Sequence, residues 1–216
     1  TCALPIYYSL EDFYGDKEHR PEVPKYDATK FKDQRIAMNT PPDLLQSRRH
    51  LSYRKPGYGM RFLREEIVGA ERFDAAFRTY VHRWAFKSPR PADFYRTMED
   101  ASGMDLQWFF RGFFEEVLLL DQAVVEVIQK NESDNGTWDV TVKLQNNEEW
   151  VCPVDLSITC ADGSKHVYLL PESIWYWSTQ HTHSFEFPSQ VIEVLIDERE
   201  VYPDIDRTNN SFIVWQ

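Results

Sequence analysis

The spacing of apolar residues changes once along this chain, and no other feature of the sequence constrains the fold more. Between Tyr58 and Phe114, apolar residues recur every three or four positions, which is typical of helices that bury one face. From about Gln122 onward they alternate with polar residues, as in strands with one buried face. The sequence therefore predicts an α+β chain, with helices first and an antiparallel β-sandwich after them.

Four helices are expected in the first part, because glycine and proline residues separate four periodic stretches. The expected helices are Tyr58–Val68, Ala70–Phe86, Pro91–Ala101 and Asp105–Phe114. Gly103 ends the third stretch, and Asp105 can cap the fourth. In the second helix one face is expected to be buried; it consists of Phe73, Ala76, Phe77, Tyr80, Val81 and Trp84.

The last expected helix carries a bulky aromatic stripe. Phe109, Phe110 and Phe113 fall at helical spacing, so we expect them in the core of the first part and not on a ligand-binding surface.

Residues 1–46 show little periodicity and contain several prolines. We interpret them as a largely irregular segment, with short helices near Tyr8–Tyr14 and Pro42–Arg48. A segment this long without regular structure is unusual in a free-standing domain. We therefore expect it to belong to a larger domain that begins upstream of Thr1.

Turn signals recur about every 8–12 residues after residue 118, which favours a β-sandwich over residues 118–216. Asp162-Gly163 is a strong hairpin signal among them. The expected strands are Ala123–Ile128, Trp138–Leu144, Trp150–Thr159, Lys165–Leu170, Ile174–Trp177, His183–Phe187 and Val191–Ile196.

Charge is divided unevenly between the two parts. The net charge is −11, but residues 1–116 hold 19 basic and 18 acidic residues, whereas residues 117–216 hold 5 and 17. This difference indicates two modules, 1–117 and 118–216. The acidic second module argues against a nucleic-acid partner, which requires basic clusters. No apolar run of about 18 residues is present, so no membrane span is expected.

Several runs around the helical part match a known pattern in the same order. Tyr53-Arg54-Lys55-Pro56 precedes Arg61–Gly69, a stretch with a leucine–arginine core and a closing glycine. The runs that follow are Arg72–Asp74, Tyr80–Pro89, Asp93–Glu99, Ser102–Gly103 and Asp105–Phe114. Together they resemble the gluzincin-type zinc aminopeptidases (alanyl aminopeptidase-like metallopeptidases). The resemblance is strong over residues 40–116 and weak elsewhere.

The resemblance implies that residues 1–117 are the helical end of a thermolysin-like catalytic domain, followed by an immunoglobulin-like accessory β-sandwich. It also implies that Tyr53 is catalytic and donates a hydrogen bond to the oxyanion of the tetrahedral intermediate. Such a donor contributes about 3–4 kcal/mol of transition-state stabilisation. Arg54 and Pro56 depart from the glutamate and glycine that many members have. From the residues alone, a tyrosine packed at a helix entrance is the alternative.

The family's zinc site needs H-E-x-x-H on a helix and a later glutamate. The six histidines are His19, His50, His82, His166, His181 and His183, and none begins that motif. Because the motif precedes the tyrosine in the family, we expect it upstream of residue 1. The parent enzyme would then use zinc, while this chain would hold no metal or other cofactor and be inactive alone. The resemblance implies as partners a peptide substrate with a free amino terminus and the remaining amino-terminal part of the same protein.

Other pairs allow two interpretations. Strand alternation places His181 and His183 on one face, as a metal pair or as residues of a solvated edge strand, and no third ligand is evident. Cys152 and Cys160 either face each other in a hairpin or are free thiols.

The acidic groups are also ambiguous. The neighbouring pairs Glu65-Glu66 and Glu115-Glu116 point about 100° apart on a helix, which favours a solvated face over an acid–base dyad. A group of acidic and amide side chains near the carboxy terminus has two interpretations, a calcium site or a structural turn. The structural turn is favoured because the D-x-D-x-D-G loop is absent. That group is Asp197, Asp204, Asp206, Asn209 and Asn210.

An alternative function is a non-catalytic interaction module, in which an exposed Trp175 and Trp177 on the sandwich bind carbohydrate or a partner protein. For the enzyme, the resemblance suggests an exported, periplasmic location.

Overall fold

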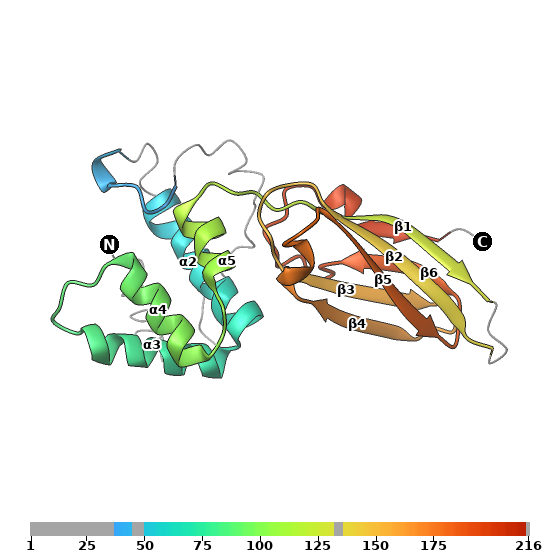
Figure 1. The fold of residues 1–216 in the computed structure, drawn as a ribbon, viewed down its shortest axis with the longest axis horizontal. Helices are drawn as coiled ribbons and strands as arrows, with labels where there is room; N and C mark the ends of the chain where they lie inside the picture. Colours follow the sequence, from blue (N-terminus) through green and yellow to red (C-terminus); the bar gives the residue numbers. More distant parts are fainter. Residues whose placement is uncertain (1–36, 45–49, 132–135, 215–216) are drawn as a thin grey trace, which may run out of the picture. The chain divides into compact units, whose positions relative to one another are not determined.

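The structure, a computed structural model, describes residues 37–44, 50–131 and 136–214. The expected helix at Tyr8–Tyr14 lies outside the described residues. The chain divides into two compact units, the first ending at Val117 and the second beginning at Leu118 (Figure 1). The first is helical and the second consists of antiparallel sheets, so the chain is α+β. In the part of the chain that is described, no helix is long and apolar enough to cross a membrane.

In its described residues, the helical unit contains four α-helices and several short 3-10 or π segments. The segments in chain order are η3 (Pro42–Leu44), η4 (His50–Arg54), α2 (Lys55–Phe62), η5 (Leu63–Val68), α3 (Ala70–Trp84), α4 (Pro91–Ser102), α5 (Gln107–Phe110) and η6 (Arg111–Glu115). All four expected helices are present. The first begins earlier than expected, because η4, α2 and η5 form one continuous helical run.

The buried face of α3 is shorter than predicted. Phe73, Ala76 and Phe77 are buried, but Val81 is 47% exposed and the helix ends before Phe86, which is fully exposed with φ +59°. At about 100° per residue, Val81 lies roughly 80° around the helix from Phe73, at the margin of the buried face. The remaining side of that face packs on α4, where Tyr80 meets the ring of Phe94 edge-on at 5.0 Å.

The aromatic stripe forms the core of this unit, as predicted. Phe109, Phe110 and Phe113 are at most 2% exposed. Phe109 stacks on Phe113 with ring centroids 5.6 Å apart, and Tyr95 from α4 stacks on Phe110 at 4.2 Å. Burial raises the pKa of Tyr95, and the charge of Glu115 raises that pKa further.

Seven strands lie in the described part of the second unit. They form two antiparallel sheets. The strands are β1 (Gln122–Lys130), β2 (Trp138–Asn146), β3 (Val154–Cys160), β4 (Lys165–Leu170), β5 (Gln180–Phe187), β6 (Val191–Ile196) and β7 (Ser211–Ile213). One sheet has the order β1-β2-β5 and the other β4-β3-β6-β7. Alternate residues of both sheets, such as Val142, Leu156, Phe187 and Val194, share one apolar core.

Two strand predictions are wrong in position. The segment expected as a strand at Ile174–Trp177 is instead the 3-10 helix η7 (Glu172–Trp175), and the seventh strand is β7. The indole Nε1 of Trp175 donates to the carbonyl of Cys152 at 2.9 Å, which fixes this turn against the core. The strand expected from Trp150 begins only at Val154. Pro153, directly before it, has no N–H to donate to a ladder.

Candidate functional site

The candidate catalytic residue, Tyr53, lies in the π-helical turn η4. Its side chain is 55% exposed, whereas Leu51 and Lys55, two positions away on either side, are 6% and 5% exposed. Residues two apart on a helix point roughly half a turn away from each other. The buried neighbours therefore anchor the turn on one side, and Tyr53 projects from the other. The side chain is therefore accessible, and its catalytic role stays a prediction.

The backbone at Tyr53 differs from the expected one. The sequence predicted that the helix begins near Tyr58, but the chain is helical from His50, and Arg54 has φ −70° and ψ −52°. Pro56 occupies the first turn of α2. A proline inside a helix has no N–H to donate to the carbonyl four residues earlier. The change from π to α geometry just before Pro56 is compatible with this missing hydrogen bond. Tyr53 is thus held by helical backbone.

Lys55 is buried beneath this turn, which sequence reasoning did not anticipate. Its Nζ lies 5.1 Å from the ring centroid of Phe113, and burial lowers the pKa of Lys55 to about 8. The signal was available in the spacing, because Lys55 lies four residues after Leu51 and four before Gly59, both buried. A lysine is rarely buried without a specific partner, and the ring face of Phe113 is one partner here.

Helix α2 approaches the aromatic core through a glycine. A Cβ atom placed on Gly59 would lie 2.3 Å from Cε1 of Phe113, so no larger residue fits without a shift. At Gly57, one half-turn away, a Cβ would meet nothing within 4 Å. The helix that carries Tyr53 is therefore seated with its Gly59 side on the core and its Gly57 side open.

The far end of the same helical run is tied to α3 by an ion pair. Arg64 donates from Nε and Nη2 to the two carboxylate oxygens of Asp74, at 2.7 and 2.8 Å. Both side chains are largely shielded, and paired charged hydrogen bonds of this kind fix orientation as well as adding energy. The contact leaves the Tyr53 helix little freedom to rotate relative to α3.

The acidic pairs of the helical unit are surface ion pairs. Glu65 accepts from Arg61 at 2.8 Å and Glu116 accepts from Arg111 at 2.7 Å, all four side chains being well exposed. Such pairs contribute about 0–1 kcal/mol, and each of these two glutamates is paired with an arginine instead of with a second carboxylate. They do not form an acid–base dyad.

Among the described residues, no cluster of three or more His, Cys, Asp or Glu side chains could hold a metal ion. His82 is exposed on α3, and His166 lies on β4. His181 and His183 lie on one face of β5, as alternation predicted, with Nε2 of His181 3.5 Å from Nδ1 of His183. His19, Cys2 and the side chain of His50 lie outside the described residues.

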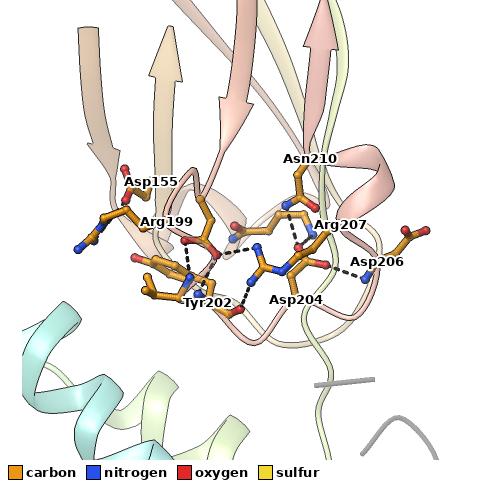
Figure 2. Close-up of polar contacts among 10 residues, drawn as sticks. Asp155, Arg199, Tyr202, Asp204, Asp206, Arg207 and Asn210 are labelled. Carbon is orange, nitrogen blue, oxygen red and sulfur yellow. Dashed lines mark hydrogen bonds and ion pairs between the residues drawn. The ribbon is translucent and has the colours of Figure 1, made fainter. Parts of the chain in front are cut away.

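The acidic group near the carboxy terminus forms a hydrogen-bonded turn (Figure 2). The buried carboxylate of Asp197 accepts from the backbone N–H of Val201 and Tyr202 at 2.9 and 2.8 Å and from Arg207 at 2.9 Å. Arg207 also donates to the carbonyl of Tyr202 at 2.5 Å. Burial raises the pKa of Asp197, although these donors oppose it.

Asp204 organises the second half of this turn (Figure 2). Its carboxylate accepts from the backbone N–H of Gln122 and Asp206, both at 2.9 Å, and from the amide of Asn210 at 3.1 Å. Burial raises the pKa of Asp204 to about 6. Since protein donors occupy these oxygens, the group acts as a structural turn and not as a calcium site.

The two tryptophans of the proposed binding module differ in exposure. Trp177 is 96% exposed, but Trp175 is only 5% exposed, so the prediction of an exposed pair is wrong for Trp175. Its indole fills the core and its N–H is used by Cys152, which explains the burial. Cys152 and Cys160 are both free thiols and buried. Burial raises the pKa of each.

No family model matches this chain, and no curated protein matches it. A solved structure of Legionella pneumophila aminopeptidase A in complex with aspartic acid is similar over 72% of this chain, with 16% sequence identity and a TM-score of 0.48. The chain spans 17% of the length of that aminopeptidase. An identity and a TM-score this low assign no function to the chain.

Proposed function

We propose that this chain is a carboxy-terminal part of a zinc-dependent aminopeptidase, in which Tyr53 donates a hydrogen bond to the oxyanion formed during peptide hydrolysis. One observation carries the proposal: Tyr53 is exposed on a helical turn whose neighbours Leu51 and Lys55 are buried. It lies in the sequence run that resembles the gluzincin aminopeptidases. A donor that is fixed before the reaction stabilises developing charge without having to reorganise.

The proposal assigns Tyr53 one task. Its phenol O–H donates to the oxygen that gains negative charge in the transition state, an interaction weaker in the bound substrate. Lys55 and Gly59 act indirectly, because they seat the helix on Phe113. We further propose that the helical unit is the end of a thermolysin-like domain and the second unit an immunoglobulin-like β-sandwich. Two antiparallel sheets around one core support the latter.

Catalytic zinc in such enzymes polarises the scissile carbonyl and activates water. The described residues do not fit this ion, because they include no cluster of three ligands. We propose that its ligands belong to an H-E-x-x-H helix and a later glutamate that precede Thr1 in the parent protein. The substrates would be peptides with a free amino terminus.

The test uses the protein expressed with the residues encoded upstream of Thr1. Zinc content is measured after dialysis, and hydrolysis of an aminoacyl anilide is compared with that of the same anilide acetylated on its amine. We expect about one zinc per chain and turnover of the free amine alone, abolished by a chelator. A protein with no zinc and no turnover above the chelated sample would refute the proposal.

A second candidate function is a non-catalytic binding module, and the exposure of Trp177 beside the half-exposed Tyr176 favours it. Exposed aromatic rings are suited to stacking on sugars or protein partners. Without peptidase activity in the longer protein, oligosaccharide binding that is lost in Trp177→Ala and kept in Trp138→Phe would support this function.

A further inference from the structure

His181 and His183 lie on β5, which is the last of the described strands in its sheet. Among the described strands, β5 pairs with β2 alone in the order β1-β2-β5, so no described strand pairs with its other side. The two histidines occupy alternate positions, and their rings point to the same face, with centroids 5.7 Å apart. Both side chains are partly exposed, so water and small ions can reach them.

The separation of their nitrogens fits a shared metal ion. Nε2 of His181 lies 3.5 Å from Nδ1 of His183. That is long for a hydrogen bond from nitrogen, usually about 2.7–3.2 Å. Two imidazole nitrogens bound to one tetrahedral zinc, each about 2.0–2.1 Å from the metal, are about 3.3–3.4 Å apart. A small closure of the pair would place both at bonding distance.

Aromatic side chains contact both imidazole rings. The ring of Trp175 meets His181 edge-on at 6.4 Å, and the ring of Phe185 lies 4.6 Å from His183. Across the sheet, the register partners of the histidines on β2 are Leu144 and Val142, which are buried and apolar. Neither partner competes for the imidazole nitrogens.

The charge of this part of the chain favours a cation. Residues 117–216 contain 5 basic and 17 acidic residues, and a surplus of negative charge raises the local concentration of divalent ions. Imidazole is a preferred ligand of Zn²⁺, Cu²⁺ and Ni²⁺, and a poor one for Mg²⁺ and Ca²⁺.

We propose that His181 and His183 form a two-nitrogen chelate for a divalent transition-metal ion, with water in the remaining positions. The site binds Cu²⁺ more tightly than Zn²⁺, following the general order of metal affinities. It is separate from the proposed catalytic zinc, and it revises the expectation that this chain holds no metal. No third ligand accompanies the pair among the described residues, so binding is reversible and weaker than in a four-ligand structural site.

The test titrates the 216-residue chain with Cu²⁺ while tryptophan fluorescence is recorded, because Trp175 lies beside His181 and Cu²⁺ quenches nearby indoles. We expect saturable quenching by one ion per chain, reversed by excess Zn²⁺ as a competitor. His181→Gln and His183→Gln should each weaken binding at least about 10-fold, since even outer-sphere partners of metal ligands are worth about 10- to 100-fold.

His82→Gln is the matched control, because His82 is exposed on α3 and should leave the titration unchanged. Far-ultraviolet circular dichroism confirms that each variant is folded. Zn²⁺ titration followed by NMR gives a second readout, in which the imidazole protons of His181 and His183 should shift most. Quenching that is absent in the wild-type chain, or equal in the wild type and both β5 variants, would overturn the proposal. The outcome does not depend on whether the parent protein is a peptidase.

Discussion

Gly59 and Phe113 are in contact so close that a single added carbon at Gly59 would lie 2.3 Å from the Phe113 ring. Gly59→Ala should therefore overpack the core and lower the free energy of unfolding by about 1–3 kcal/mol. Gly57→Ala is the matched control in the same helix. Its Cβ meets nothing within 4 Å, so it should raise stability by about 0.5–1 kcal/mol through helix propensity. Urea denaturation of both variants measures the difference, and equal effects of the two substitutions would contradict this packing.

Phe110 should contribute strongly to the stability of the helical unit. It is 2% exposed and stacks on Tyr95 at 4.2 Å. Phe110→Ala should therefore cost about 3–5 kcal/mol and lower the melting temperature sharply. Phe86→Ala, at a fully exposed ring, should change stability by less than about 0.5 kcal/mol. A Phe110→Ala loss as small as that of Phe86→Ala would show that the ring is not core.

Asp204 should make stability fall as pH rises through the weakly acidic range. Burial raises its pKa from 3.8 to about 6, so the folded chain binds more protons than the unfolded chain between those values. Asp204 contributes on the order of 3 kcal/mol to the free energy of unfolding below about pH 4. This contribution is lost as pH rises through 6. Denaturant unfolding at several pH values measures the trend.

Asp204→Asn should reduce this decrease and leave the part due to Asp197, whose pKa burial also raises. The loss of a carboxylate acceptor for Gln122 and Asp206 lowers stability at every pH. Asp206→Asn is the control. It is exposed, and Thr208 holds the pKa of Asp206 below its usual value, so the decrease between pH 4 and 6 should persist. A wild-type decrease that is just as large in Asp204→Asn would assign it to another group, such as Asp197.

The spacing of apolar residues was enough to predict the α+β architecture and the aromatic core. Phe109, Phe110 and Phe113 are large and apolar at helical spacing, and burial is the dominant outcome for such a stripe. The predicted burial was less accurate for side chains that have both apolar and polar parts. Trp175 was expected at the surface, but its ring fills the core while its N–H bonds to Cys152, a partner distant in sequence.

The sequence identified Tyr53 as the candidate catalytic residue, but it predicted less about the residues around Tyr53. The exposure of Tyr53 follows from its place opposite Leu51 and Lys55, once the helix is known to begin at His50. The expected start at Tyr58 was too late, because the sequence does not reveal that a π turn precedes Pro56. The burial of Lys55 depends on the ring of Phe113, which lies 58 residues further along the chain.

The substitution Tyr53→Phe in the longer, zinc-containing protein tests the proposed function most directly. It removes one hydroxyl from an exposed side chain, so the free energy of unfolding should barely change. Steady-state kinetics should show kcat lowered about 100-fold or more, as for loss of one oxyanion donor, with KM little changed because the charge develops only in the transition state. A Tyr53→Phe enzyme with kcat near that of the wild type would contradict the catalytic role of Tyr53.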